Sequence, residues 1–512
     1  MGEAKIVSGD RTISGAELSE SVARAAAGMS SLGVGENDTI AMLLRNDIAF
    51  FQASQAAALL GAYATPINWH YTADEAQYII RNSGAKLVVA HADLIDRVAG
   101  DLGDGVSLLG VQTPDEIARA YRVAAADTIL PAGVPDWSQW ITEFPVRPAA
   151  EQLSRGSMIY TSGTTGRPKG VRRAPSTPEQ MLAAARMALE GFGLPADGDC
   201  RILMNGPMYH SAPNAYGLFA ARTGAYIVLQ PRFDPEDLLR LIDTHAISHM
   251  HVVPTMFVRL LKLPESVRAR YDVSSLRYVV HGAAPCAPDI KRAMIEWWGP
   301  VINEYYGATE TGIVVTNNSE QALAKPGTVG RAVKGGIVRI YDDDGTALGP
   351  GEIGEVYVRL EDLSDFTYHD NDSARAEIER EGLVTVGDMG YLDADGYLYL
   401  CDRKRDMIIS GGVNIYPAEI EVVLITMPGI VDCAVFGIPH EEFGEAICAY
   451  VEVDPDSSVT EALVREFLRD RVAGFKLPRV VELVGDLPRE DSGKIFKRKL
   501  RAPYWQDAGR QI

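Results

Sequence analysis

Signals for helices and for short strands alternate along the first four hundred residues of this chain. Ser14 followed by Glu17 forms a capping-box pattern, in which a hydroxyl and a carboxylate satisfy backbone donors at a helix start, and the pattern recurs at 72–75. Between such helices lie short apolar runs with the length of buried strands, at 86–90, 226–229 and 276–280. The alternation predicts an α/β fold with a layered body and largely parallel sheets.

From about residue 327 the pattern changes to short strands separated by Asp and Gly turns, at 335–341, 354–359 and 396–400. A charged junction follows at 403–406, and beyond it helices and strands alternate again to the end of the chain. We therefore expect a large N-terminal domain over 1–402 that includes a small β subdomain at about 327–402. A hinge at 403–406 and a small α+β C-terminal domain over 407–512 complete the predicted organisation.

The composition excludes several classes of protein. With 512 residues and 46% hydrophobic content, the chain is long enough to bury more than one core. Its net charge of −20 argues against a nucleic-acid surface, which needs an excess of cations. There is no signal-peptide pattern and no apolar run long enough to cross a membrane, and the five cysteines have no metal-ligand spacing. These features predict a cytoplasmic protein with reduced thiols.

The most specific feature is a loop at residues 160–170 with the sequence Tyr-Thr-Ser-Gly-Thr-Thr-Gly-Arg-Pro-Lys-Gly, preceded by an apolar run that suits a buried strand. Its glycines let the backbone approach a ligand closely, its hydroxyls donate hydrogen bonds, and Lys169 supplies a positive charge. This composition favours a polyphosphate-binding loop over an ordinary polar turn. The lysine follows Gly166 by three positions, so the spacing is not that of a Walker-type loop.

The loop resembles the phosphate loop of the adenylate-forming superfamily, which includes acyl- and aryl-CoA synthetases, luciferases and the adenylation domains of peptide synthetases. Further elements similar to those of the family recur in order, from about residue 10 to about residue 500. The resemblance implies that the loop contacts the phosphates of ATP. The residues to which it assigns this role are Thr161, Ser162, Gly163, Thr164, Thr165, Gly166 and Lys169.

Two further segments resemble the family's adenine and phosphate contacts. At 303–311 the resemblance places Tyr306 against the adenine ring, Thr309 near the α-phosphate and Glu310 as a ligand of Mg²⁺, a cation that prefers oxygen ligands. The segment 281–285 is similar to the end of the strand that recognises adenine. The other nucleotide contacts that these segments imply are Gly282, Ala283, Ala284, Pro285, Tyr305, Gly307 and Ala308.

The ribose contacts are implied by two later residues. Asp388 matches the aspartate that holds the ribose hydroxyls in relatives, and Arg403 matches an arginine that also contacts the ribose. Family members often carry Thr where Val386 stands, so a hydrogen bond from that hydroxyl is missing here. From the residues alone, Arg403 equally suits a surface salt bridge with Asp402 or Asp406.

The C-terminal part resembles the mobile domain of the family. Lys494 matches the catalytic lysine, whose ammonium can reach the charge that develops between the attacking carboxylate and the α-phosphate. Arg405 matches the hinge about which this domain rotates between two catalytic poses. Gly411 and Gly412 resemble the glycine turn beside the channel for the pantetheine arm of CoA, where a Cβ would obstruct the channel.

The segment 207–216 resembles the one that guards the acyl site in relatives. His210 is expected to position the carboxylate and Ala212 to leave room beyond it, while an interior histidine satisfied by packing is the alternative for His210. His249 and His251 flank an apolar position, which favours ordinary packing over metal binding. The other residues expected to line the acid are Tyr216, His281, Gly282, Gly312, Ile313 and Val314.

These matches imply an AMP-forming acid–CoA ligase that uses ATP, Mg²⁺ and CoA. Its expected catalytic residues are Lys494, Glu310, Thr161 and His210. A carboxylate would attack the α-phosphate to give acyl-AMP and pyrophosphate, and CoA would then displace AMP. The apolar lining favours a hydrophobic acid of the fatty, aryl-alkanoic or steroid type. A stand-alone enzyme that loads a carrier protein, a luciferase-like oxidase and a non-catalytic nucleotide-binding protein are the alternatives, and association into a homodimer is left open.

Overall fold

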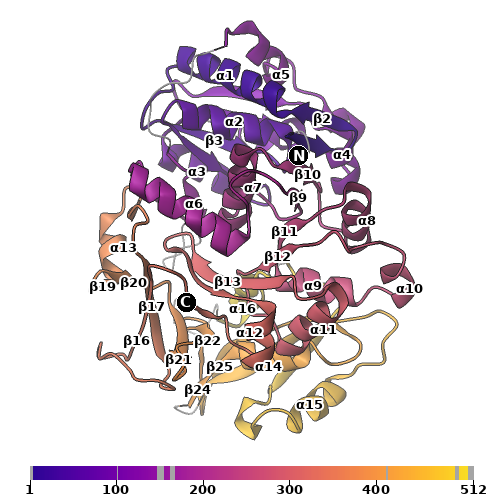
Figure 1. Ribbon diagram of the computed structural model, residues 1–512. Coiled ribbons are helices and arrows are strands. Elements are labelled where there is room, and N and C mark those ends of the chain that lie inside the picture. The colour runs from indigo at the N-terminus through magenta and orange to yellow at the C-terminus, as the bar shows by residue number, and fades with distance from the viewer. Residues whose placement is uncertain are drawn as a thin grey trace.

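The computed structural model describes residues 4–100, 102–146, 155–161, 168–410, 413–489 and 495–505. In spatial order, the strands of its largest sheet within these ranges are β15 (Arg331–Ala332), β14 (Gly312–Asn317), β13 (Ile302–Ala308), β12 (Tyr278–His281), β11 (His249–Val252), β9 (Arg201–Met204), β10 (Tyr226–Leu229), β1 (Lys5–Ser8) and β2 (Arg11–Ser14). This sheet crosses the middle of the molecule (Figure 1). The run from β13 to β1 is parallel, and the pairs at both edges are antiparallel.

A second sheet is wholly parallel, with the order β4 (Tyr63–Pro66), β3 (Thr39–Leu43), β5 (Ala85–His91) and β6 (Ser107–Val111). The main hydrophobic core lies between the two sheets and is filled from α1 (Gly15–Ser31), α2 (Ile48–Leu59), α6 (Pro178–Phe192) and α7 (Ser211–Thr223). A second core covers the other face of the large sheet, under α8 (Pro235–His245), α9 (Pro254–Leu261) and α11 (Pro288–Trp298). The predicted α/β body with largely parallel sheets is confirmed.

Both predicted capping boxes are present. Ser14 Oγ accepts the N–H of Glu17 at 3.2 Å, and the Glu17 carboxylate accepts the N–H of Ser14 at 2.8 Å, which starts α1. Thr72 starts α3 (Ala73–Ser83) in the same way. The strand predicted at 276–280 is observed as β12, which starts two residues later, at Tyr278.

Short antiparallel strands form the β subdomain: β16 (Gly336–Tyr341), β17 (Gly354–Leu360), β19 (Glu379–Arg380), β20 (Leu383–Val384), β21 (Asp388–Leu392) and β22 (Leu398–Arg403). Beside it lies a small antiparallel sheet of β18 (Phe366–Tyr368), β8 (Lys169–Arg173) and β7 (Ile159–Thr161). The predicted phosphate loop runs from the end of β7 to the start of β8, so this sheet anchors both of its ends.

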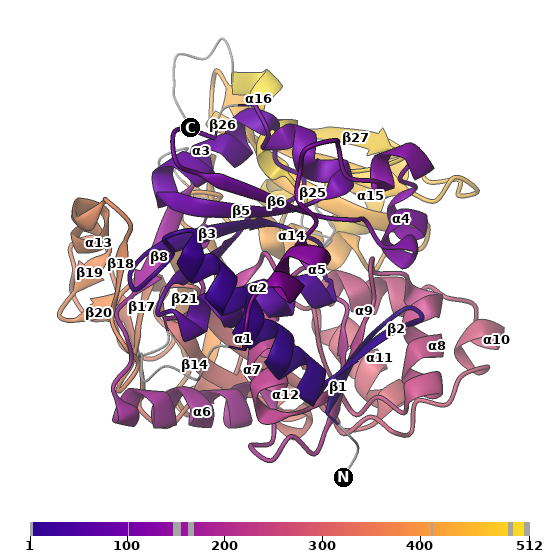
Figure 2. The same ribbon diagram turned by 90° about the horizontal axis from the view of Figure 1, so that it is seen from above.

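The C-terminal elements form their own sheet, with β24 (Val413–Ile415), β23 (Ile408–Ser410), β26 (Gly444–Val453), β25 (Ile430–His440) and β27 (Val480–Val484). Its helices are α14 (Pro417–Leu424), α15 (Glu461–Arg469) and α16 (Lys497–Trp505), and a separate hydrophobic core lies among these elements. Figure 2 shows them grouped on one side of the molecule, in orange and yellow. No helix in the described ranges is both long and apolar enough to span a membrane.

One lysine of the large domain contacts the C-terminal elements, and another ties the junction to the β subdomain. Lys262 Nζ, just after α9, donates to the carbonyl oxygens of Ile430 and Val431, each at 2.6 Å. Lys404 Nζ pairs with Asp343 at 2.7 Å and with Glu355 at 3.1 Å.

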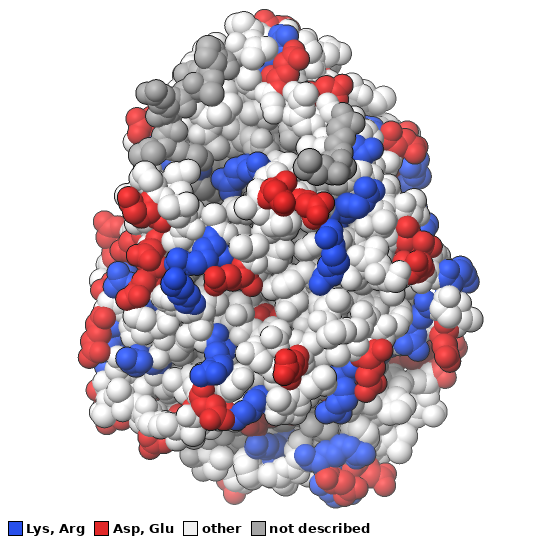
Figure 3. All heavy atoms as spheres, viewed as in Figure 1, with Lys and Arg blue, Asp and Glu red and all other residues white. Residues whose placement is uncertain are grey.

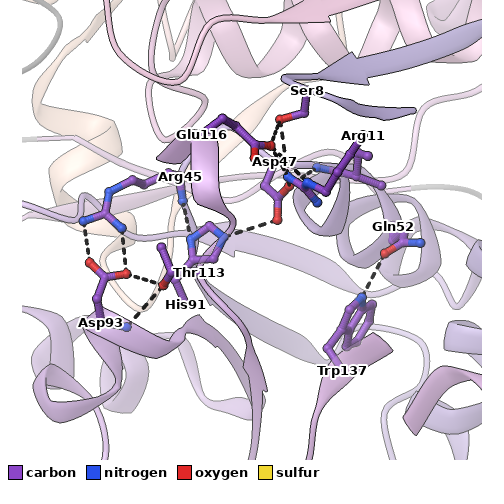
Figure 4. Close-up of polar contacts among 11 residues, drawn as sticks. Ser8, Arg11, Arg45, Asp47, Gln52, His91, Asp93, Thr113, Glu116 and Trp137 are labelled. Carbon is purple, nitrogen blue, oxygen red and sulfur yellow. Dashed lines mark hydrogen bonds and ion pairs between the residues drawn. The ribbon is translucent and has the colours of Figure 1, made fainter. Parts of the chain in front are cut away.

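Buried charges hold the N-terminal elements together (Figure 4). The Asp47 carboxylate accepts the first N–H of α2, from Ile48, and lies 2.6 Å from Arg11 Nη2 and 3.2 Å from His91 Nε2. The backbone N–H of Arg45 donates to His91 Nδ1 at 3.1 Å, which leaves the ring proton on Nε2, facing Asp47. Although burial would raise it, the hydrogen bond from His91 and the charge of Arg11 lower the pKa of the Asp47 carboxyl to about 2.

Candidate active site

Strand β13 brings the residues predicted to hold adenine and ribose next to the β subdomain. Tyr306 OH donates to Asp388 Oδ2 at 2.8 Å, and Arg403 Nε lies 3.5 Å from Asp388 Oδ1. Asp388 and Arg403 are direct partners across β21 and β22, so backbone register fixes their proximity. Burial and the neighbouring Asp388 carboxylate raise the pKa of Tyr306 well above its usual value, which keeps its hydroxyl protonated as a donor.

The predicted adenine loop follows β12 and is held in a strained turn. Gly282 is buried, and a Cβ added there would lie 2.6 Å from the ring of Tyr305, so only glycine fits. Ala283 has φ +67°, in the left-handed region that residues with a Cβ seldom adopt. Ala283, Ala284 and Pro285 are exposed, which leaves a flat apolar surface for a base. Strain of this kind occurs at functional sites more often than elsewhere.

The Glu310 carboxylate lies at the centre of the site and is almost fully buried, at 7% exposure. Tyr368 OH donates to Glu310 Oε1 at 3.0 Å, and Thr161 Oγ1, at the end of β7, lies 3.4 Å from the same oxygen. Thr309 Oγ1 donates to Ser211 Oγ at 2.9 Å, which ties the β13 turn to the start of α7. The predicted phosphate contacts Thr161, Thr309 and Glu310 therefore meet at one place.

Arg173, on β8, holds this turn from behind. Its guanidinium donates to the carbonyl oxygens of Thr309 at 3.0 Å, of Glu310 at 2.6 Å and of Ser364. Burial lowers the pKa of Arg173 to about 10, so the group is still protonated near neutral pH. Neither Arg173 nor Tyr368 is predicted from the sequence, because neither belongs to a motif and both reach Glu310 through strand pairing.

The acid side of the site faces the core between the two sheets. His210 directly precedes α7, and its ring lies 4.4 Å from that of Tyr209. Tyr216, in the middle of α7, is fully buried, with its ring 5.5 Å from Phe192 and 6.1 Å from His251. His251 Nε2 lies 2.9 Å from Tyr305 OH. Burial lowers the pKa of His251 to about 4, so this histidine is neutral at physiological pH.

The residues predicted to line the acid do not all share one face. Ala212, Tyr216 and Ile313 belong to the core between the sheets, and Gly312 precedes Ile313 at the start of β14. Val314 faces the core of the β subdomain instead. His281 is fully buried on yet another face, with Phe257 at 5.3 Å between ring centroids and Glu304 Oε1 at 3.8 Å from its Nδ1. The side chains of His281 and Val314 are thus separated from those of Ala212, Tyr216 and Ile313.

The remaining predicted residues are partly outside the described ranges. These are Ser162, Gly163, Thr164, Thr165, Gly166, Gly411, Gly412 and Lys494. Lys169 is described, and its Nζ lies 5.3 Å from the centre of the Tyr368 ring. Arg405 is exposed in the short connection between β22 and β23, where a hinge residue would have to be. Figure 3 shows basic and acidic side chains interspersed over one face of the molecule, without a field of a single sign.

The residues around Glu310 suit a magnesium ion that arrives with a nucleotide. Within the part of the chain that the structure describes, no cluster of three or more His, Cys, Asp or Glu side chains could hold a metal. Glu310 with the hydroxyl of Thr161 offers an oxygen-only donor set. Mg²⁺ is commonly bound by one or two carboxylates together with substrate phosphates, and this donor set fits that mode.

These features fit one class of protein, a nucleotide-dependent enzyme: the large α/β body brings together the residues predicted to contact base, ribose and phosphates, and the C-terminal elements follow a charged connection. The family of AMP-binding enzymes matches residues 2–364, and the AMP-binding enzyme C-terminal domain matches residues 419–494. The chain belongs to the AMP-binding enzyme family, within the adenylate-forming superfamily, as its motifs predicted.

Its relatives match nearly end to end. FadD13 of Mycobacterium tuberculosis, a long-chain-fatty-acid–CoA ligase, is 32% identical over 494 residues, which cover 96% of this chain and 92% of FadD13. A methyl-dioxo-octahydroindenyl-propanoyl:CoA ligase of the same species is 33% identical over 501 residues, covering 97% of this chain and 95% of the relative. The crystal structure of the anthranilate CoA ligase AuaEII with anthranoyl-AMP gives a TM-score of 0.84 at 25% identity, covering 99% of this chain and 96% of that chain. The protein is an AMP-forming acyl-CoA synthetase, which joins a carboxylic acid to CoA through acyl-AMP at the expense of ATP.

Proposed function

We propose that the acid is a hydrophobic ring acid, of the steroid or aryl-alkanoic type, that carries an oxo or hydroxyl group. The Tyr216 hydroxyl carries this proposal. It is fully buried, and within the described ranges it has no hydrogen-bond partner. A buried hydroxyl left without a partner costs about 1–3 kcal/mol, so a ligand oxygen at this position would bind favourably.

The position of Tyr216 indicates how the acid would extend from its carboxylate. Ser211 begins α7 and contacts Thr309, the residue proposed near the α-phosphate. Tyr216 follows Ser211 by five residues, a rise of about 7 Å along the helix axis. An acid whose carboxylate lies at the start of α7 and whose body follows the helix would extend toward the ring of Tyr216.

Two relatives at similar identity act on different candidate acids. The name of one specifies two oxo groups on a bicyclic ring, and the name of the other specifies long-chain fatty acids. A plain fatty acid is the second candidate, and the apolar side chains of Phe192 and Ile313 favour it. The His251–Tyr305 pair beside Tyr216 adds polar atoms that an alkyl chain would not use, which favours the oxygen-bearing acid.

The nucleotide roles that we propose follow the geometry of the described residues. Glu310 would hold Mg²⁺, which neutralises phosphate charge when bound. Tyr306 and the loop from Gly282 to Pro285 would hold adenine, with Tyr305, Gly307 and Ala308 shaping the same strand end. Asp388 and Arg403 would hold the ribose. Thr161, the loop at 162–166 and Lys169 would contact the phosphates, and His210 would position the carboxylate.

The second step requires the C-terminal domain to rotate about Arg405. We propose that Lys494 serves the adenylation step and that Gly411 and Gly412 border the thiol channel afterwards. Ile409 and Val413 flank this glycine turn and are 47% and 44% exposed, which is unusual for apolar side chains on a short hairpin. A rotation that packs them against the large domain would bury them.

Thioester formation from matched acids tests the substrate. Purified protein with Mg-ATP and CoA is given pairs of ring acids that differ by one oxo group, together with fatty acids of equal carbon number, and products are quantified by mass spectrometry. We expect kcat/KM for the oxo acid to exceed that for its deoxy partner by about tenfold or more, and Tyr216→Phe to remove most of this ratio.

Tyr226→Phe is the matched control, because its hydroxyl contacts His245 at the far side of the large sheet. A preference for the deoxy or fatty acids that Tyr216→Phe leaves unchanged would contradict the proposed acid. Accumulation of acyl-AMP without thioester would show that a carrier protein replaces free CoA as the acceptor.

A further inference from the structure

We propose that Tyr368 and Arg173 are positioning residues that hold Glu310 in place for the metal–nucleotide complex, Tyr368 through the carboxylate and Arg173 through the backbone. The inference rests on the role proposed above for Glu310. It concerns two residues that lie outside every motif of the chain and that meet Glu310 only in the folded structure.

Tyr368 fixes the rotation of the Glu310 carboxylate. Its hydroxyl donates to Glu310 Oε1 at 3.0 Å, and both side chains are almost fully buried. Because one oxygen of Glu310 is committed to this bond, the second oxygen is directed away from Tyr368 and is left for a ligand.

Arg173 fixes the backbone that carries Glu310. A guanidinium offers donors in a rigid planar fork, and here the donors span two successive carbonyl oxygens, those of Thr309 and Glu310. A third donation, to the Ser364 carbonyl oxygen, ties the same group to the segment that leads into β18. Arg173 and Phe366 are direct partners between β8 and β18, and Val171 pairs with Tyr368, so both positioning residues belong to one strand pair.

The Glu310 carboxylate is buried without a cation of its own. Across the described ranges, no nitrogen of Lys, Arg or His forms an ion pair with it, whereas the buried Asp47 is paired with Arg11 and the buried Glu304 with Lys291. Arg173 donates its hydrogen bonds to carbonyl oxygens rather than to the carboxylate, and its charge attracts Glu310 only from behind the turn, without an ion pair. A buried carboxylate held by hydroxyls alone is therefore ready to accept a cation delivered by the ligand.

Tyr368 also links Glu310 to the lysine of the phosphate loop. Lys169 Nζ lies 5.3 Å from the centre of the Tyr368 ring, within the range of a cation–π contact. One side chain thus orients a metal ligand through its hydroxyl and supports a phosphate-binding cation through its ring. Tyr368→Phe removes the first function and keeps the second, and Tyr368→Leu removes both.

Binding of Mn²⁺ in place of Mg²⁺ tests the proposal independently of turnover. Mn²⁺ affinity is measured by electron paramagnetic resonance on the full-length enzyme with α,β-methylene-ATP, which cannot be adenylated. We expect Tyr368→Phe and Arg173→Lys to weaken Mn²⁺ binding by about tenfold, since hydrogen bonds to charged groups are the strong ones. Tyr368→Leu should in addition raise the Kd of the analogue itself.

Turnover gives the second readout. Pyrophosphate release by Tyr368→Phe should need a higher Mg²⁺ concentration for half-maximal rate, while thioester formation from preformed acyl-AMP stays at the wild-type rate. Tyr341→Phe is the matched control, because its hydroxyl makes a similar bond of 2.9 Å to Glu381 in the β subdomain. That control should retain wild-type Mn²⁺ affinity, and thermal unfolding of every variant shows whether it is folded.

Glu310→Gln separates the two possible failures. If Glu310→Gln binds Mn²⁺ as tightly as the wild type, the proposed metal role of Glu310 is wrong. If Glu310→Gln loses Mn²⁺ while a folded Tyr368→Phe binds it normally, Glu310 is a metal ligand and the positioning role of Tyr368 is wrong. Loss in both variants, with Tyr341→Phe unaffected, is the expected result.

Discussion

Asp47 and Glu310 are both buried carboxylates, but the protein neutralises only one of them. Asp47 contacts Arg11 at 2.6 Å and His91 at 3.2 Å and also begins α2, so its charge is satisfied within the fold. Glu310 has hydroxyl neighbours, Tyr368 and Thr161, and no ion pair within the ranges that the structure describes. We interpret the difference as one charge that serves the fold and, as proposed above, one that is left for a ligand.

A third buried carboxylate supports this distinction. Glu304 Oε2 lies 2.5 Å from Lys291 Nζ, and both side chains are almost fully buried. Burial raises the pKa of Glu304, but the lysine charge and its hydrogen bond oppose that shift. Glu304 lies two residues before Tyr306 on β13, yet it faces α11 and is paired there. Nearness to the site therefore does not by itself leave a carboxylate without a cation.

The largest effect on stability is expected from Asp47→Ala. The substitution leaves Arg11 and His91 without their shared carboxylate and removes the N-cap of α2. Arg11 is partly exposed and keeps Glu116 as a partner, so the loss comes from the N-cap, about 1 kcal/mol, and from the unsatisfied buried His91, about 1–3 kcal/mol. We expect the free energy of unfolding to fall by about 2–4 kcal/mol. Urea unfolding followed by the fluorescence of the buried Trp137, which lies in the same hydrophobic core as α2, measures it.

Asp38→Ala is the matched control, because Asp38 pairs at 2.8 Å with Lys86, which is exposed to solvent. Exposed pairs contribute about 0–1 kcal/mol, so this variant should unfold almost as the wild type does. An Asp47→Ala protein as stable as Asp38→Ala would show that the buried network contributes no more than a surface pair.

Glu310→Gln should lower activity and leave stability nearly unchanged. Removing a buried charge that has no cation partner should leave the unfolding free energy within about 1 kcal/mol of the wild type, or raise it. The rate of pyrophosphate release should fall by about 10²–10³, the usual loss when one electrostatic contact to the transition state is removed. The urea midpoint and the pyrophosphate assay on one preparation check both. A clear loss of stability would place Glu310 with Asp47 as a structural carboxylate.

The features that can be predicted from the sequence are those encoded by residues close together in the chain or by a recognisable motif. Capping boxes such as Ser14 with Glu17 act over three residues, so they can be read directly and are confirmed. Tyr306, Asp388 and Arg403 are far apart in the chain, but each belongs to a motif, and the structure does bring them together.

The pairing and register of strands far apart in the chain could not be predicted from the sequence. Arg173 and Tyr368 reach Glu310 because β8 pairs with β18 across almost two hundred residues, and no local signal encodes that pairing. The resemblance implied that His281 lines the acid site, and no local signal tells which face of the sheet its side chain occupies. Its strand partner is Glu304, and alternation along β13 places Glu304 and Tyr305 on opposite faces, so His281 faces away from Tyr305.

The pH range over which stability is lost distinguishes the buried histidines from the buried carboxylates. Burial lowers the pKa of both His249 and His251 to about 4, against an ordinary value of 6.5. Between pH 6.5 and 4 the unfolded chain binds more protons than the folded protein, so stability falls as the pH falls. Each histidine contributes a slope of up to about 1.4 kcal/mol per pH unit. Asp47, whose pKa is about 2, loses its contribution only below its ordinary value of 3.8.

His251→Gln tests this assignment, because an amide can still reach the Tyr305 hydroxyl but does not titrate. The free energy of unfolding is measured in urea at each pH from 7 to 4 and plotted against pH. The slope of this plot should be smaller than in the wild type by up to about 1.4 kcal/mol per pH unit, which corresponds to one bound proton. An unchanged slope would mean that His251 is already protonated in the folded protein. A positive charge would then lie beside Tyr216 and Tyr305, and the acid that binds there would be expected to carry a second anionic group rather than a neutral oxygen.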